Sequence, residues 1–279
     1  MHHKPLVGKV AIVTGAGSPI GLGRAMTIAL INAGARVAML DINDIWLTQT
    51  ANEMRQIGGN DCVLTHVTDV SDPESAEEAV KTTISGLGGL HILINNAGIM
   101  SPIESETNKP NFWDVETAVW NKVLEVNSSG PFHMAKASAG HMISQDWGRI
   151  IGVTTSIDSM YRPGMCPYGP SKACHEALIA LMAIELKHTN VTANVLIPGG
   201  TTDTNILPQN IQQDRTTLIR PEIMQAPVVW LSSEEAGSIN GQRFIAYNWD
   251  ETLPIKQRIQ KAGAPAAWPQ LGYQTINPW

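Results

Sequence analysis

The segment TGAGSPIGLG, residues 14–23, follows the apolar run KVAIVTG at residues 9–15 and opens a segment of helical periodicity. A glycine-rich turn between a buried strand and a helix gathers free backbone N–H groups at the positive end of the helix dipole, an arrangement that favours phosphate. The turn therefore predicts a dinucleotide-binding loop. The alternative is an ordinary strand-to-helix turn with spare glycines.

Pro19 stands in this loop where a further glycine would be expected. Ser18 followed by Pro19 predicts a helix N-cap with proline at the first helical position, where its missing N–H is no loss. The next two residues would still present N–H groups toward a pyrophosphate. The cofactor-binding residues predicted in the loop are Gly15, Gly17, Ser18, Ile20 and Gly21.

Short β-branched runs alternate with helical segments along the whole chain, which is typical of a parallel sheet covered on both faces. We predict an α/β fold, Rossmann-like and doubly wound, with a parallel seven-stranded sheet. The strands are predicted at 9–15, 36–40, 62–67, 91–96, 149–154, 191–197 and 243–247. Helices are predicted near 20–33, 44–57, 73–86, 114–144, 167–188 and 221–234.

The 279 residues, 43% of them hydrophobic and 16% charged, suit one domain spanning residues 1–279. No linker or repeat divides the chain. Residues 250–279 differ, because they are rich in proline and carry two tryptophans. We expect them to form a C-terminal tail that packs on the pocket or on an oligomer interface.

The formal net charge of −6, without a run of lysine or arginine, argues against nucleic acid and membrane surfaces as partners. A small-molecule partner is expected instead. Three cysteines without C-x-x-C spacing suggest neither a disulfide framework nor a metal site, and they fit a reducing cytoplasmic location. The N-terminal histidines are assigned no role.

Asp41 ends the second predicted strand, eighteen residues after Gly23. A carboxylate at this place accepts hydrogen bonds from the adenosine ribose hydroxyls and repels a 2′-phosphate. No lysine or arginine directly follows it, so the sequence predicts that NAD(H) is preferred over NADP(H). Alternatively, Asp41 simply caps the following helix together with Asn43 and Asp44.

Tyr168 and Lys172, in the stretch YGPSK, are four residues apart and so lie on one face of a helix. An ammonium group beside a phenol lowers the pKa of the phenol from its usual value near ~10. Such a tyrosine can exchange a proton with a carbonyl or alcohol oxygen while hydride moves to or from a nicotinamide.

Together these motifs resemble the short-chain dehydrogenase/reductase family, in its single-domain Tyr-x-x-x-Lys branch, over residues 8–247. The family loop is T-G-x-x-x-G-x-G, and Pro19 replaces its middle glycine. The resemblance implies further cofactor contacts, in the adenine region, in the N-N-A-G signature at 95–98 and in the turn after the sixth strand. They are Asp69, Val70, Asn95, Ala97, Gly98, Tyr168, Lys172, Pro198, Gly199 and Thr201, with Thr204 as the rival of Thr201.

The family also places a serine thirteen residues before the tyrosine, and here that residue is Thr155. Ser156 is the alternative for the same role. Because adjacent side chains of a strand point to opposite faces, Thr155 and Ser156 cannot both contact the substrate oxygen unless the strand has already ended. The resemblance implies that Asn127 distorts a helix and holds a water for a proton relay, although a buried asparagine satisfying helix backbone is the alternative. The implied catalytic residues are thus Asn127, Thr155, Tyr168 and Lys172.

The substrate pocket is expected to include Ser156, Asp158 and Gly200, with the connection between Gly98 and Asn127 as one wall. From the loop after the fifth predicted strand, Ser159, Met160 and Arg162 are expected to approach it together with Asp158. One of three tryptophans, Trp249, Trp268 or Trp279, is expected to cover it or else to pack in the core or an interface. The predicted activity is NAD(H)-dependent interconversion of a secondary alcohol and a ketone. Alternatives are lyase or epimerase chemistry on the same fold and a dinucleotide sensor without turnover. The family resemblance also implies a homodimer or homotetramer formed through the helices at 114–144 and 167–188.

Overall fold

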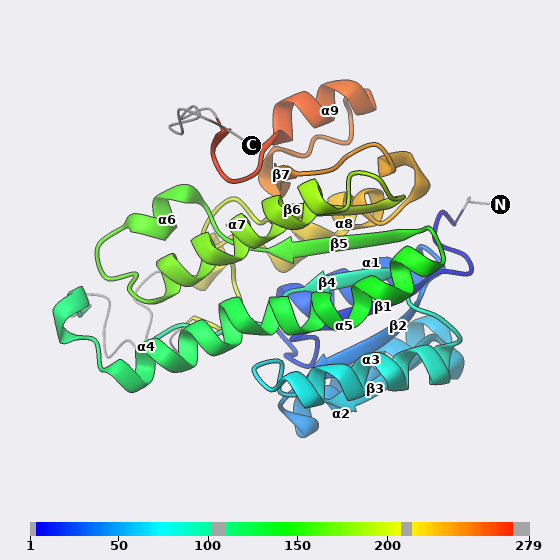
Figure 1. Ribbon diagram of the computed structural model, residues 1–279, viewed down its shortest axis with the longest axis horizontal. Coiled ribbons are helices and arrows are strands. Elements are labelled where there is room, and N and C mark those ends of the chain that lie inside the picture. The colour runs from blue at the N-terminus through cyan, green and yellow to red at the C-terminus, as the bar shows by residue number, and fades with distance from the viewer. Residues whose placement is uncertain (1–3, 102–109, 208–213, 270–279) are drawn as a thin grey trace.

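A computed structural model of the protein describes residues 4–101, 110–207 and 214–269 (Figure 1). Within these ranges one sheet has the strand order β3-β2-β1-β4-β5-β6-β7-β8. Neighbouring strands from β3 to β7 are parallel, and β8 is antiparallel to β7. The strands are β1 (Val10–Thr14), β2 (Arg36–Asp41), β3 (Val63–Val67), β4 (Ile92–Asn95), β5 (Gly148–Val153), β6 (Val191–Ile197), β7 (Gln242–Ile245) and β8 (Gly263–Pro265).

The apolar side chains of each central strand divide between two hydrophobic cores, because successive residues of a strand face opposite sides. In β1, Ala11 and Val13 join one core, whereas Val10 and Ile12 join the other. All four are fully buried. Burial on both faces explains why the strands read as continuous apolar runs rather than alternating ones.

Helices cover both faces of the sheet, as Figure 1 shows. Side chains of α1, α2 and α8 fill the first core, and those of α3, α5 and α7 fill the second. The helices are α1 (Leu22–Asn32), α2 (Asp44–Gly58), α3 (Pro73–Leu87), α4 (Thr117–Leu124), α5 (Gly130–Ser144), α6 (Ile157–Tyr161), α7 (Tyr168–Glu185), α8 (Gln225–Leu231) and α9 (Ile255–Ala262). The predicted doubly wound fold is confirmed, with an eighth, antiparallel strand beyond the seven expected.

The helix predicted at 114–144 begins at Thr117 and contains a π-helical turn, Glu125–Ser129, between α4 and α5. The short α6 was not predicted from the sequence, since five residues are too few to show a helical period. None of the described helices is long and apolar enough to cross a membrane.

The described part of the tail packs on the sheet edge rather than over the pocket. After α9, strand β8 pairs with β7, and the N–H of Ala266 donates to the carbonyl of Gly241 at 3.0 Å. Residues 270–279, and with them Trp279, lie outside the described residues.

The strand order reverses direction between β1 and β4. In open α/β sheets, ligands bind at such a switch point, beyond the carboxyl ends of the strands. This rule directs attention to the turns that follow β1, β2, β4, β5 and β6.

Candidate active site

A cavity of about 650 Å³ opens at the carboxyl ends of these strands. Residues from widely separated parts of the sequence meet in it. The predicted residues that line it are Gly15, Ser18, Ile20, Gly21, Asp41, Asp69, Val70, Ala97, Gly98, Thr155, Ser156, Tyr168, Lys172, Pro198, Gly199, Gly200, Thr201 and Thr204. Gly17, Asn95, Asn127 and Asp158 do not line it.

The glycine loop differs from our prediction at Pro19, because α1 begins at Leu22 and its N-cap is Gly21. Ser18 does not cap the helix; its hydroxyl donates to the carbonyl of Ile20 at 3.0 Å. The segment after β6 fixes this conformation, since Asn205 donates from its backbone to Ile20 at 3.0 Å and from its side chain to Ser18 at 3.0 Å. Pro19 therefore lies in a bend ahead of the helix.

The loop nevertheless fits a pyrophosphate group. Among the described residues, the backbone N–H groups of Ile20 and Gly21 have no acceptor, and both residues line the cavity. Gly15 has φ +64°, and a Cβ there would lie 2.9 Å from the Cα of Ala97. A Cβ on Gly23 would lie 2.3 Å from the carbonyl oxygen of Gly15. Glycine is thus required for the turn and for the close packing of helix on strand.

Asp41 faces the glycine loop from the end of β2. Its Oδ2 accepts the N–H of Gly17 at 2.8 Å, and its Oδ1 accepts the N–H of Asn43 at 3.0 Å. The cap of α2 is Asn43, whose side chain accepts the N–H of Trp46 at 3.0 Å. The geometry therefore assigns the capping role to Asn43 and leaves the Asp41 carboxylate at the cavity wall.

The N-N-A-G segment joins β4 to the glycine loop. The Thr14 hydroxyl accepts the N–H groups of Asn96 and Ala97 at 2.9 and 3.0 Å, and the Asn96 amide donates to the carbonyl of Thr14 at 2.8 Å. Asn95 is buried instead, with its amide donating to the carbonyl of Pro131 at 3.1 Å. The predicted cofactor contact of Asn95 is therefore corrected. Its side chain is outside the cavity lining and joins β4 to α5 instead.

Asp69 and Val70 line the cavity beside Lys122 of α4. The Lys122 ammonium lies 3.8 Å from Asp69 and donates to Ser71 at 3.3 Å. Burial opposes ionisation of Asp69, but hydrogen bonds from Ser71 and the nearby Lys122 outweigh it and hold its pKa below the usual value. This end of the cavity therefore carries an ionised carboxylate.

Thr155 and Tyr168 meet at the opposite end of the cavity. Thr155 is close enough to Tyr168, which starts α7, to act on its pKa, whereas the Ser156 hydroxyl lies 2.9 Å from the hydroxyl of Ser159. Of the two rival hydroxyls, the structure therefore favours that of Thr155 as the partner of the tyrosine. Both side chains reach the cavity because β5 has already ended at Val153.

Lys172 lies one helical turn after Tyr168, with its ammonium 5.9 Å from the centre of the phenol ring. It donates to the carbonyl of Val153 at 2.9 Å. Burial lowers the pKa of Lys172 to about 8 and raises that of Tyr168 to about 12, while the Thr155 hydrogen bond acts to lower the latter. Contrary to our expectation, burial outweighs any effect of Lys172 on the tyrosine in this structure.

Asn127 lies in the π-helical turn and is fully buried. Its side chain exchanges two hydrogen bonds with the backbone of Ile99, at 2.8 and 2.9 Å, and donates to Ser171 at 2.9 Å. A Cβ built on Gly98 would lie 3.1 Å from the Lys172 nitrogen and 3.3 Å from the Asn127 oxygen. Gly98 thus lets the two side chains approach the same point.

The turn after β6 forms another wall, in which Gly199 has φ +106° and a Cβ would lie 2.7 Å from Tyr247. Both Thr201 and Thr204 line the cavity, so their positions do not decide which of the two threonines would contact the cofactor.

Two expectations about the substrate pocket fare differently. Asp158 is exposed on α6 and absent from the cavity lining, which corrects our prediction for this residue. Of the expected wall after Gly98, residues 102–109 lie outside the described residues.

Several lining residues were not predicted. Ile42 and Trp46 follow Asp41 in the chain, and Met165 precedes the tyrosine by three residues. Asn205, which holds the glycine loop, is the most consequential of them. The proximity of Ile42 and Trp46 to Asp41 in sequence was a usable signal, whereas nothing local to Asn205 indicates a contact 187 residues away.

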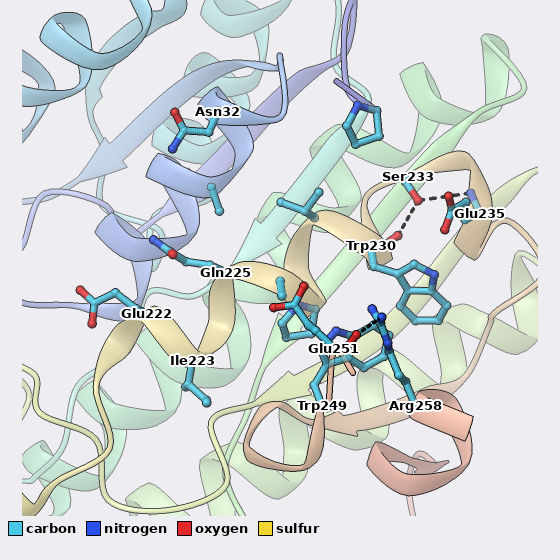
Figure 2. A pocket seen from close by; sticks show the side chains of 15 residues that line it. Asn32, Glu222, Ile223, Gln225, Trp230, Ser233, Glu235, Trp249, Glu251 and Arg258 are labelled. Carbon is cyan, nitrogen blue, oxygen red and sulfur yellow. Dashed lines mark hydrogen bonds between the residues drawn. The ribbon is translucent and has the colours of Figure 1, made fainter. Parts of the chain in front are cut away.

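Trp249 does not cover this cavity. It packs against Trp230, with ring centres 4.8 Å apart, and lines a separate cavity of about 600 Å³ between α1, α8 and the tail. Figure 2 shows Arg258 of α9 beside these rings, with its Nη2 hydrogen-bonded to the backbone carbonyl of Glu251. Trp249 is thus part of the core contact between the sheet and the tail.

The sheet, the glycine loop and the tyrosine–lysine pair define a nucleotide-dependent oxidoreductase class, and comparisons with known proteins agree. The family model for short chain dehydrogenases matches residues 9–215. The chain therefore belongs to the short-chain dehydrogenase/reductase family, whose members use NAD(P)(H).

The chain is 29% identical over 245 residues to 3-oxoacyl-[acyl-carrier-protein] reductase FabG of Thermotoga maritima, covering 85% of this chain and 95% of that one. It is 30% identical over 244 residues to 2,5-dichloro-2,5-cyclohexadiene-1,4-diol dehydrogenase LinX of Sphingobium indicum, covering 85% and 93%. A solved short-chain type dehydrogenase/reductase from Mycobacterium marinum superposes with a TM-score of 0.75 at 25% identity, covering 87% and 95%.

Proposed function

We propose that the protein interconverts a secondary alcohol and a ketone, with NAD(H) as the redox cofactor. The observation that carries the proposal is that Thr155, Tyr168 and Lys172 line the same cavity as the glycine loop. A hydroxyl pair in this position can hold one substrate oxygen and exchange a proton with it.

The residues that would hold the cofactor fall into three groups: the glycine loop for the pyrophosphate, Asp41 for the adenosine ribose, and Lys172 with the turn after β6 for the nicotinamide half. The bound nicotinamide would donate or accept hydride. The basic residues of the described cavity lining are Lys122, Arg162 and Lys172, and none of them is next to Asp41 in the chain. A 2′-phosphate of NADP(H) would therefore meet the Asp41 carboxylate without a neighbouring basic residue, which supports NAD(H).

Tyr168 would act as the proton donor in ketone reduction and as the acceptor in alcohol oxidation. A phenol with a pKa of about 12 keeps its proton at every lower pH, so at neutral pH it is ready to donate. Thr155 would orient the substrate oxygen. Lys172, with its pKa lowered to about 8, carries its positive charge below that pH and loses it as the pH rises further.

The two directions should therefore differ in their pH dependence. We expect the rate of ketone reduction to change little between about pH 6 and about pH 8, because Tyr168 remains protonated there. The rate of alcohol oxidation should rise with pH over the same range, because it requires the deprotonated phenol. Steady-state profiles of kcat in both directions measure this, and an oxidation rate that fell with rising pH would contradict the assignment.

Replacing Asp41 by alanine should weaken NADH binding by about tenfold or more, because charge-assisted hydrogen bonds to the ribose hydroxyls are lost. NADPH binding should change far less. Fluorescence titration with both cofactors measures the two dissociation constants.

Asp61→Ala is the matched control, since Asp61 is an exposed carboxylate just before β3, at the end of that strand opposite the cavity. It removes the same charge at a distance from the cavity lining and should leave both affinities unchanged. Equal losses of NADH and NADPH affinity in Asp41→Ala would remove the role assigned to this residue.

The overall proposal is tested by titrating the purified protein with NADH and NADPH and then following nicotinamide absorbance with polyols, hydroxy ketones and aryl alcohols. Binding of NADH with turnover of a substrate supports it. Binding without turnover would favour a sensor, and several products from one substrate would favour lyase or epimerase chemistry. Failure to bind either cofactor would overturn the proposal.

We also propose a homodimer or homotetramer in the cytoplasm. Exposed apolar side chains support the assembly: Phe132 and Ile143 on α5 are 47% and 45% exposed, and Leu181 and Ile184 on α7 are 51% and 64% exposed. The three cysteines are free, which is compatible with a reducing compartment. Light scattering coupled to size exclusion tests the assembly, and cell fractionation tests the location.

A further inference from the structure

Thr155 lies beyond the end of β5, where the sheet no longer fixes the backbone. The last pair in the register of β5 with β6 is Val153 with Leu196. From Val153 onward, three consecutive residues are held by side chains of other elements. The carbonyl of Val153 accepts from Lys172, the hydroxyl of Thr154 donates to Glu176 at 3.1 Å, and the carbonyl of Thr155 accepts from Arg243 at 2.9 Å.

Glu176 and Arg243 form a buried ion pair from α7 and β7. The Nε of Arg243 donates to Oε1 of Glu176 at 2.9 Å, and its Nη2 donates to Oε2 at 3.3 Å. Glu176 is 0% exposed and Arg243 is 6% exposed. Removing two charges from water is costly, and an apolar pair of similar volume would often be as stable. The ion pair is therefore better explained by the geometry it imposes than by stability.

The bidentate geometry leaves the guanidinium in one orientation. The same Nη2 that contacts Glu176 also donates to the carbonyl of Thr155. A planar guanidinium held by a carboxylate has its remaining donors aimed in fixed directions, which an ammonium on a flexible stem does not provide. The position of the Thr155 backbone thus depends on how Glu176 holds Arg243.

We propose that Arg243, oriented by Glu176, is a positioning residue that holds Thr155 in place beside Tyr168 at the cavity wall. This inference rests on the proposed function, in which Thr155 orients the substrate oxygen. Arg243 and Glu176 are absent from the described cavity lining, so both act through Thr155 rather than on the substrate.

The tail contributes to the same cluster. Following β8, the N–H of Ala267 donates to Oε1 of Glu176 at 3.4 Å. Glu176 thereby receives hydrogen bonds from β7, from the end of β5 and from the tail, so that each carboxylate oxygen has two donors. The described part of the tail therefore helps to hold Glu176, and through it Arg243, on the side of Thr155 away from the cavity.

The test is a double-mutant cycle between Arg243→Lys and Thr155→Ala. Lysine keeps the charge opposite Glu176 but lacks the fixed fork that reaches the Thr155 carbonyl. We expect Arg243→Lys to lower kcat about tenfold in the otherwise wild-type chain and less than about twofold in the Thr155→Ala background, because coupled residues are not additive. The dissociation constant of NADH should stay unchanged in Arg243→Lys.

Arg149→Lys is the matched control. Arg149 is a buried arginine near the other end of β5, where it also donates to backbone carbonyls, those of Ser233, Gly148 and Asn190. Six residues of extended chain place it ~20 Å from Thr155. Its replacement should lower the thermal unfolding temperature and leave kcat unchanged, which separates a loss of stability from a loss of positioning.

Crystal structures of the wild type and both arginine variants provide a readout that needs no substrate. The position of the Thr155 hydroxyl relative to Tyr168 should be the same in the wild type and in Arg149→Lys and should shift in Arg243→Lys. An unchanged Thr155 position in Arg243→Lys, or equal kcat losses in both threonine backgrounds, would overturn the positioning role. A wild type that binds no dinucleotide would instead overturn the proposed function, and the crystal structures alone would then decide the role of Arg243.

Discussion

Replacing Tyr168 by phenylalanine should lower kcat by about a thousandfold, because removal of a positioned general acid or base costs about 10²- to 10⁴-fold. Tyr168 is the only tyrosine in the described cavity lining, so no other phenol there could replace it. The aromatic ring and its packing remain. The dissociation constant of NADH should therefore change only a few-fold, and stopped-flow absorbance of the nicotinamide measures the hydride step directly.

Tyr161→Phe is the control for this change. Tyr161 ends α6, seven residues earlier, and is 72% exposed, so it loses the same hydroxyl outside the cavity lining. It should retain full activity. If Tyr168→Phe turned over substrate at the wild-type rate while binding NADH, the acid–base assignment would be wrong.

Thr155→Ala should lower kcat about a hundredfold, because loss of a donor that stabilises a reacting oxygen costs on the order of 10²- to 10³-fold. Ser156→Ala should cost less than about threefold, since the Ser156 hydroxyl pairs with Ser159 instead. Rates of hydride transfer for the two variants separate the rival hydroxyls.

Thr155→Ser serves as the conservative variant for this position. Serine keeps the donor and acceptor but lacks the methyl group that stiffens the side chain, so most of the activity should remain. A larger loss from Ser156→Ala than from Thr155→Ala would show that the alignment of the catalytic hydroxyl is shifted by one residue.

The fold was predictable because the strands are buried on both faces and therefore read as apolar runs in sequence. β8 was not, since Gly263, Ala264 and Pro265 carry no strand propensity and pair only because β7 offers an open edge. The start of α1 was also mispredicted. Local cap rules favour Ser18 and Pro19, but the distant Asn205 holds that loop in another conformation.

Much of the candidate site follows from motifs in which function requires particular residues at fixed spacing, as in the pair Tyr168 and Lys172. Asn96 rather than the predicted Asn95 lines the cavity, because the two side chains lie on opposite sides of the chain at the end of β4. The N-N-A-G signature alone does not show which of the two asparagines faces the cavity. The pair of Glu176 and Arg243, 67 residues apart, leaves no local pattern. Buried charge pairs between distant elements are visible only after folding.

Strand β8 has a consequence for how copies of this chain can associate. An uncovered edge strand presents free N–H and C=O groups to which another chain can add a strand. β7 would be such an edge, but its open side is paired with β8, which is three residues long and ends in Pro265, a residue without an N–H. Extension of the sheet into a second subunit through β7 is therefore blocked by the chain itself.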